Sequence, residues 1–185
     1  MSRAVIDGAR QRMEKAVQNF ERELGGVRAG RATPALLERV RVQAYGSELP
    51  VQQVASIHVP DARTLVIQPW DKGLVTAVER AILKSDLGLN PSSDGQVIRL
   101  VIPPMTEQRR TELVRQVRKM AEEARVAVRN IRREANEQLK AEMKAEALSE
   151  DQERREQEEV QRLTDRFVQA IDEALAAKEK EIMEV

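Results

Sequence analysis

The sequence contains no cysteine, a single histidine and few aromatic residues among its 185 positions. The absence of cysteine excludes a disulfide framework, a thiolate metal site and a cysteine nucleophile. Without a second histidine, a transition-metal site is not expected either. No apolar run is long enough for a membrane-spanning helix or for the core of a signal peptide. We therefore expect a cytoplasmic protein that has no membrane partner.

The sequence also lacks the usual signatures of an enzyme. It has no glycine-rich phosphate loop followed by Lys and Ser/Thr, and no nucleophile elbow. His58 alternates with Ile57 and Val59 in a predicted strand, which places the imidazole on the solvated side. Paired carboxylates are common, but they lie on exposed helix faces where nothing would raise a pKa. We predict that the protein is not an enzyme and needs no cofactor.

The shortage of aromatic residues limits how the chain could bind RNA. Proteins that read single-stranded RNA stack the bases on exposed aromatic side chains. The helices cannot supply such a platform, because both phenylalanines, Phe20 and Phe167, lie on predicted apolar seams. If the protein binds RNA, we expect it to bind folded RNA through the backbone and its shape.

Long helices are predicted at both ends of the chain. Segment Ser2–Arg28 has apolar residues at spacings of three and four, the pattern of a helix in a bundle. A second helix is predicted from Thr106, which can cap it, to about Leu148, and the capping box Ser149–Gln152 starts a third. The three predicted seams consist of Ile6, Ala9, Met13, Ala16, Phe20, Leu24 and Val27; of Leu113, Val117, Met120, Ala124, Val128, Ile131, Ala135 and Leu139; and of Val160, Leu163, Phe167, Ile171, Leu175 and Ile182.

The middle of the chain, residues 30–104, has a different composition. It holds all seven prolines and five of the eight glycines, so the flanking helices are almost free of residues that break them. One helix is predicted at roughly Gly73–Asp86. Four β-branched runs bounded by turn residues predict strands at Arg39–Tyr45, Val54–Val59, Thr64–Pro69 and Gln96–Ile102.

These patterns predict an α+β protein with two domains. Each long helix is apolar on one side only, so the simplest arrangement is a three-helix bundle formed by residues 1–29 and 105–185. Residues 30–104 then form a small inserted β/α/β domain, joined to the bundle by two short chain crossings. The three helices cover one another's seams, so we expect a monomer.

Charge is unevenly distributed, although the formal net charge is zero. From Arg109 to Arg133 there are nine Lys/Arg against three Asp/Glu, whereas from Glu142 to Val185 there are seven against fourteen. One face of the second helix carries a stripe of basic residues: Arg118, Arg125, Arg129, Arg132, Arg133 and Lys140.

The arginine stripe and the apolar seams together leave three possible explanations. Guanidinium groups match phosphate oxygens, which favours a nucleic-acid backbone as the ligand. Alternatively, the stripe is a solvated or intramolecularly paired face, although acids on this helix are mostly not positioned for such pairing. A third possibility is a scaffold that docks partner proteins through coiled-coil faces, but the three helices of one chain leave no seam uncovered.

Four motifs resemble those of the bacterial ribosome recycling factor family. They are Val27–Ala32, Ser85–Pro91, Pro103–Arg110 and Ala124–Arg133, and the similarity runs over the whole chain in one register. The resemblance implies an L-shaped molecule whose outline has been likened to transfer RNA. It also implies that the bundle binds the large ribosomal subunit after termination. With elongation factor G, which hydrolyses GTP, such a factor splits the ribosome into subunits, and DNA is not a partner.

The resemblance also implies functional residues. Arg129, Arg132 and Arg133 match family positions that touch large-subunit ribosomal RNA. We predict that the complete rRNA-binding set consists of these three together with Arg110, Arg118 and Arg125. The hinge is predicted to consist of the two chain crossings, namely Arg28, Ala29, Gly30 and Arg31 in the first and Pro103, Pro104, Met105 and Thr106 in the second.

Overall fold

The computed structural model describes residues 2–146 and 149–184. The chain divides into two compact units, one made of the residues up to Ala29 and from Thr106 onward, the other of Gly30–Met105. We call them the bundle and the head. Both helices and strands are present, as expected for the predicted α+β class. In the described residues, no helix combines the length and hydropathy needed to cross a bilayer.

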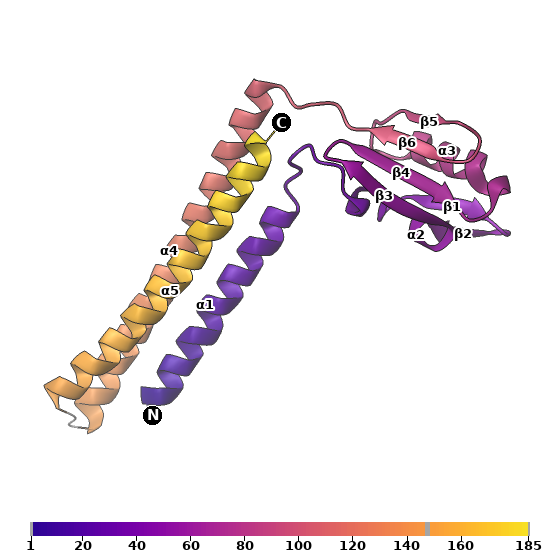
Figure 1. Ribbon diagram of the computed structural model, residues 1–185. Coiled ribbons are helices and arrows are strands. Elements are labelled where there is room, and N and C mark those ends of the chain that lie inside the picture. The colour runs from indigo at the N-terminus through magenta and orange to yellow at the C-terminus, as the bar shows by residue number, and fades with distance from the viewer. Residues whose placement is uncertain (1, 147–148, 185) are drawn as a thin grey trace. The chain divides into compact units, whose positions relative to one another are not determined.

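The bundle consists of three helices, α1 (Ser2–Gly25), α4 (Glu107–Glu146) and α5 (Glu150–Met183), which lie side by side in Figure 1. The two predicted caps are confirmed. The Thr106 hydroxyl accepts a hydrogen bond from the Arg109 amide at 3.1 Å. The Ser149 hydroxyl accepts one from the Gln152 amide at 3.3 Å. The predicted end of the second helix, near Leu148, lies outside the described residues.

The apolar seams of the three helices form the core of the bundle. Most predicted seam positions are buried, and Met13, Val128 and Leu139 are fully so. Four predicted seam positions are only half-buried, namely Ala16, Met120, Phe167 and Leu175. In the first two cases the prediction was wrong by one residue, because the adjacent Val17 and Ala121 are buried instead. Spacings of three-then-four and four-then-three both fit a 3.6-residue period, and the sequence pattern does not distinguish them.

The head contains two antiparallel sheets. Strands β1 (Arg41–Ala44) and β2 (Ser47–Pro50) form a hairpin. The four-stranded sheet has the order β3-β4-β6-β5. Its strands are β3 (Ala55–Asp61), β4 (Thr64–Pro69), β5 (Pro91–Ser93) and β6 (Ile98–Val101), and the head also contains the helices α2 (Val51–Val54) and α3 (Val75–Lys84).

The head departs from the sequence prediction at its edges. Strand β2 was not predicted because Ser47–Pro50 neither alternates nor is rich in β-branched residues. Strand β5 was taken for a turn because it reads Pro-Ser-Ser. The predicted strand over residues 39–45 ends earlier, since Tyr45 (φ 52°) and Gly46 (φ 75°) form the left-handed two-residue turn of the β1–β2 hairpin.

The head has a core of its own. Alternate residues of the strands point inward, as Leu65 and Ile67 do in β4 and as Ile98 and Leu100 do in β6. The residues of α3 that face them are Val78 and Ile82. His58 is exposed as predicted, but its neighbour Val59 is also 42% exposed, because β3 is an edge strand of the sheet.

Leu139 in α4 offers a direct test of the bundle core. We expect Leu139→Ala to lower the free energy of unfolding by roughly 2–5 kcal/mol, because a fully buried side chain leaves a cavity. Urea unfolding followed by circular dichroism at 222 nm measures the change. The adjacent exposed residue serves as the control, and Lys140→Ala should change stability by less than about 0.5 kcal/mol. Equal stabilities of the two variants would show that this helix face is misassigned.

Candidate nucleic-acid interface

Helix α4 carries all six arginines of the predicted rRNA-binding set, and the structure divides them by what they contact. Two of them form ion pairs with α5. Arg118 Nε lies 2.6 Å from Glu179 Oε1, and Arg125 Nη2 lies 2.7 Å from Asp172 Oδ1. Arg125 comes seven residues after Arg118 on α4, and its partner Asp172 comes seven residues before Glu179 on α5. This is the register expected of two antiparallel helices.

The ion pairs place these two arginines in the helix–helix contact. Arg125 also donates to Glu122 at 3.0 Å, and its side chain is only 19% exposed. Burial lowers the pKa of Arg125, but its hydrogen bonds with Asp172 and Glu122 outweigh that effect and leave the pKa raised. Its hydrogen bond with Glu179 raises the pKa of Arg118 in the same direction. Both guanidinium groups are therefore held in place as permanent cations.

These contacts contradict one expectation from the sequence. The charge count along α4 indicated that acids are mostly not positioned to pair with the stripe. For Arg118 and Arg125 that expectation was wrong, because their partners lie on α5. The missed residues, Asp172 and Glu179, repeat the seven-residue spacing of the arginines that they contact. Comparing charge spacing between the two helices, in antiparallel register, could have found them.

The other arginines of the stripe are less constrained. Arg129 is exposed, and its nearest carboxylate oxygen, on Glu122, lies 3.6 Å away. Arg132 is half-buried and donates to Gln161 Oε1 at 3.4 Å. Arg133 is exposed and has no ion pair or side-chain hydrogen bond with any residue that the structure describes. Arg129 and Arg133 are one helical turn apart, so α4 presents two adjacent, accessible guanidinium groups.

Arg110 stands apart from this surface. It lies in the first turn of α4, where its amide donates to the Thr106 carbonyl at 3.0 Å. The side chain is half-buried, and its Nε is buried without a hydrogen-bond partner among the described residues. Its guanidinium is therefore less accessible than those of Arg129 and Arg133.

The two predicted hinge segments are held at the head end by one hairpin turn. Next to the first segment, the Ala32 amide donates to the Ala62 carbonyl at 2.8 Å; next to the second, the Ile102 amide donates to the Arg63 carbonyl at 2.7 Å. Residues 62 and 63 form the turn between β3 and β4. Gly30 has a φ of 73°, and a Cβ there would lie 3.1 Å from Met105 Cγ, so a side chain at this position would be strained.

The described residues do not gather a metal site. In residues 2–146 and 149–184, no three or more His, Asp or Glu side chains come together in a way that could hold an ion. The chemistry available to the α4 surface is therefore that of charged hydrogen-bond donors. Guanidinium groups of this kind bind phosphate or carboxylate oxygens.

Comparison with known proteins identifies the family to which this chain belongs. The profile of the family described as "Ribosome recycling factor" matches residues 20–183. The chain belongs to the ribosome recycling factor family. The ribosome-recycling factor of Symbiobacterium thermophilum is 63% identical over 185 residues, covering all of both chains. That of Halalkalibacterium halodurans is 57% identical over the same span, again with full coverage of both chains.

Solved structures of the ribosome recycling factor agree with this assignment. A solution structure of a ribosome recycling factor has a TM-score of 0.73 at 45% identity and covers all of this chain and 98% of its own. A second match, with a TM-score of 0.64 at 46% identity and full coverage of both chains, comes from models for the Thermus thermophilus ribosome recycling factor and the Escherichia coli elongation factor G bound to the E. coli post-termination complex. The resemblance inferred from the four motifs is confirmed.

The Arg125–Asp172 pair can be tested separately from any ligand. In a double-mutant cycle of Arg125→Ala and Asp172→Ala, we expect a coupling energy of roughly 0.2–1 kcal/mol in the free energy of unfolding, because Asp172 is half-exposed. Urea denaturation of the free protein measures it. A coupling energy of zero would contradict a structural role for Arg125. Arg125 would then again be a candidate for binding RNA.

Proposed function

We propose that this protein recycles ribosomes, binding the post-termination ribosome on its large subunit and splitting it into subunits together with elongation factor G. Family membership over nearly the whole chain supports the function. A relative bound with elongation factor G to the post-termination complex supports the two partners. In this proposal the protein is a binding factor and not an enzyme, and GTP hydrolysis belongs to elongation factor G.

One observation supports α4 as the surface that meets ribosomal RNA. Ion pairs with α5 hold the inward-facing arginines, while the guanidinium groups of Arg129 and Arg133 stay accessible one turn apart. Arg132 lies beside them with a single long hydrogen bond to Gln161. Exposed guanidinium groups spaced along one helix face can each reach a phosphate of a rigid RNA backbone.

The proposed rRNA-binding set is therefore narrower than the one predicted from the sequence. Arg129, Arg132 and Arg133 make the contacts with RNA. Arg118 and Arg125 position α4 against α5, and Arg110 is left out because its side chain is half-buried in the first turn of α4. The alternative, a scaffold that docks helices through coiled-coil faces, has less support, because the apolar seams of all three helices are buried within the bundle.

We further propose that the chain crossings act as a hinge. Each crossing is short, and Gly30 adopts a backbone conformation that other residues rarely reach. Both crossings start beside the turn between β3 and β4. Two such connections would restrict the movement of the head more than a single connection would. Element-terminal residues of this kind commonly absorb the backbone changes of a hinge. The bundle would then hold the ribosome while elongation factor G acts on the head.

The arginine surface predicts a defined loss of binding. We expect Arg129→Ala combined with Arg133→Ala to weaken binding to the large subunit by about 1–3 kcal/mol per arginine, because each loses a charged hydrogen bond to phosphate. The slope of log K against log salt should flatten by about one unit per arginine. Sedimentation with purified subunits at graded salt measures both quantities.

A matched control comes from α5. Arg155 and Arg162 are likewise exposed and have no ion pair among the described residues. The double variant Arg155→Ala, Arg162→Ala removes the same charge from a different helix and should bind as the parent protein does. If both double variants lose affinity equally, only the overall charge matters, and the α4 surface is not the site.

The proposed division of labour predicts that binding and splitting can be separated. A chain in which a short Gly/Ser linker replaces residues 31–103 should still bind the large subunit, because the bundle has its own core. It should not split ribosomes in the presence of elongation factor G and GTP, as followed by light scattering. Full splitting by this variant would show that the head is dispensable and that no hinge is needed.

A further inference from the structure

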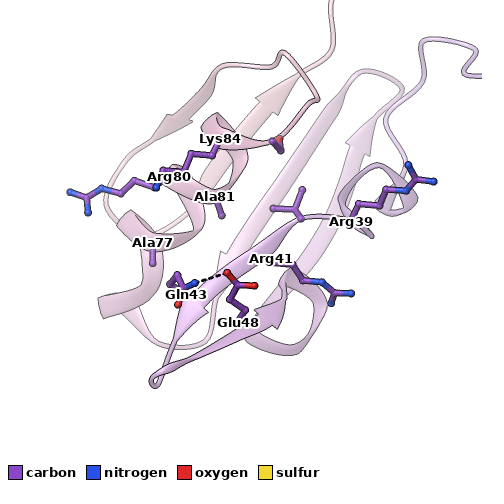
Figure 2. Close-up of a pocket in the computed structure, with 10 residues that line it drawn as sticks. Arg39, Arg41, Gln43, Glu48, Ala77, Arg80, Ala81 and Lys84 are labelled. Atoms are coloured by element: carbon purple, nitrogen blue, oxygen red, sulfur yellow. Dashed lines mark hydrogen bonds between the residues drawn. The ribbon is translucent and has the colours of Figure 1, made fainter.

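The head carries a basic hollow that the proposed function does not use. It lies between α3 and the β1–β2 hairpin and has a volume of about 420 Å³. Figure 2 shows four cationic side chains around it, two from α3 and two from the β1 side. The α3 residues are Arg80 and Lys84, and those of the β1 side are Arg39 and Arg41.

Ordinary helix and strand periodicity builds this surface. Along β1, the side chains of Arg41 and Gln43 are exposed, whereas that of Val42 between them is buried in the core. Residues two apart in the strand therefore share its outer face. On α3, Arg80 and Lys84 are four residues apart and share one face. They lie off the buried face of that helix, which contributes Val78 and Ile82 to the core of the head.

The four cations are available to a ligand. None of them has an ion pair or a side-chain hydrogen bond with a residue that the structure describes. The single carboxylate in the lining, that of Glu48, is already engaged, since Gln43 Nε2 donates to its Oε1 at 2.7 Å. Between the cations the lining includes the short side chains of Ala77 and Ala81, over which a ligand can approach the backbone closely.

The arrangement of the cations fits an extended ligand better than a compact one. In Figure 2 the guanidinium groups of Arg80 and Arg39 point away from each other on opposite sides of the hollow. A single small anion could not contact both. A chain of phosphates that crosses the hollow could meet a cation on either side.

Two exposed aromatic residues lie near the tip of the β1–β2 hairpin and the start of α3. Tyr45 lies two residues beyond Gln43, and its side chain is 73% exposed. Its hydroxyl donates to Asp71 Oδ2 at 3.1 Å, and this bond raises the pKa of Tyr45. Trp70, the residue next to Asp71, is 68% exposed and is the only tryptophan of the chain. Both rings thus lie at the end of the head where α3 begins.

We propose that this face of the head, formed by the hollow and the two aromatic residues, binds single-stranded nucleic acid, and RNA in the setting of the proposed function. A cationic groove that follows the backbone, with aromatic rings on which bases stack, is the general design of single-strand binding sites. A duplex would leave the rings unused, because its bases are already stacked. An acidic protein would use the cations but would gain little from ring faces.

Fluorescence of Trp70 tests the proposal directly, since no other tryptophan contributes. The full-length protein is titrated at low salt with an oligouridylate of about ten nucleotides. We expect saturable quenching as a base stacks on the indole. Arg80→Ala combined with Lys84→Ala should weaken the affinity by roughly tenfold or more and flatten its salt dependence. Tyr45→Leu should also weaken binding, whereas Tyr45→Phe, which keeps the ring, should not.

The controls separate this site from the other surfaces. Arg63→Ala combined with Arg99→Ala removes two charges of the head that do not line the hollow and should leave the titration unchanged. Arg129→Ala combined with Arg133→Ala should also leave the quenching unchanged. The two proposals can therefore fail independently, because each depends on a different set of cations. An oligodeoxythymidylate that binds equally would assign recognition to phosphate and base stacking without the 2′-hydroxyl, which the proposal allows.

Three results would overturn the proposal. The first is the absence of quenching at low salt, and the second is an unchanged affinity in the Arg80→Ala, Lys84→Ala variant. The third is equal binding by an oligoglutamate or by duplex RNA of the same charge, which would make the face an acidic-protein site or a non-specific backbone site.

Discussion

The contact between α4 and α5 determines which part of the basic stripe remains for a ligand. Arg118 and Arg125 meet Glu179 and Asp172 at matching seven-residue steps. Because Arg125 is four-fifths buried, removing Asp172 would leave a largely desolvated charge with Glu122 as its remaining partner, so the contact disfavours other registers of the two helices. Further along α4, Arg132 still reaches α5 through its hydrogen bond with Gln161, whereas Arg129 and Arg133 have no hydrogen bond or ion pair with α5 among the described residues.

The sequence was sufficient to predict the parts of the fold that depend on periodicity. The three long helices, their caps at Thr106 and Ser149, and the buried faces of α3 and β4 follow from regular spacing of apolar residues. Strands β2 and β5 could not be predicted in this way. Both are short edge strands, stabilised by hydrogen bonds to a neighbouring strand and not by an alternating pattern of their own.

The candidate site shows the same division between local and tertiary information. That α4 bears a basic face follows from one helix wheel, and the resemblance of four motifs assigned the family. Which arginines pair with α5 depends on acids that are distant in sequence, so no local pattern could have separated Arg125, which contacts Asp172, from Arg129, whose ion pair is with Glu122 on the same helix. The basic hollow of the head was missed for a related reason. Its cations come from a strand and a helix that tertiary packing brings together.

Internal neutralisation of charge gives this protein a way to be selective for RNA surfaces. With 31 basic and 31 acidic residues, it has no net charge to draw it to nucleic acid as a whole. The acids of α5 neutralise the arginines at the helix contact, and exposed cations remain on α4 and beside the hollow of the head. Binding then requires phosphates to lie where those few cations are. A protein of the same fold with a uniformly basic surface would lose that requirement, because any RNA would satisfy it.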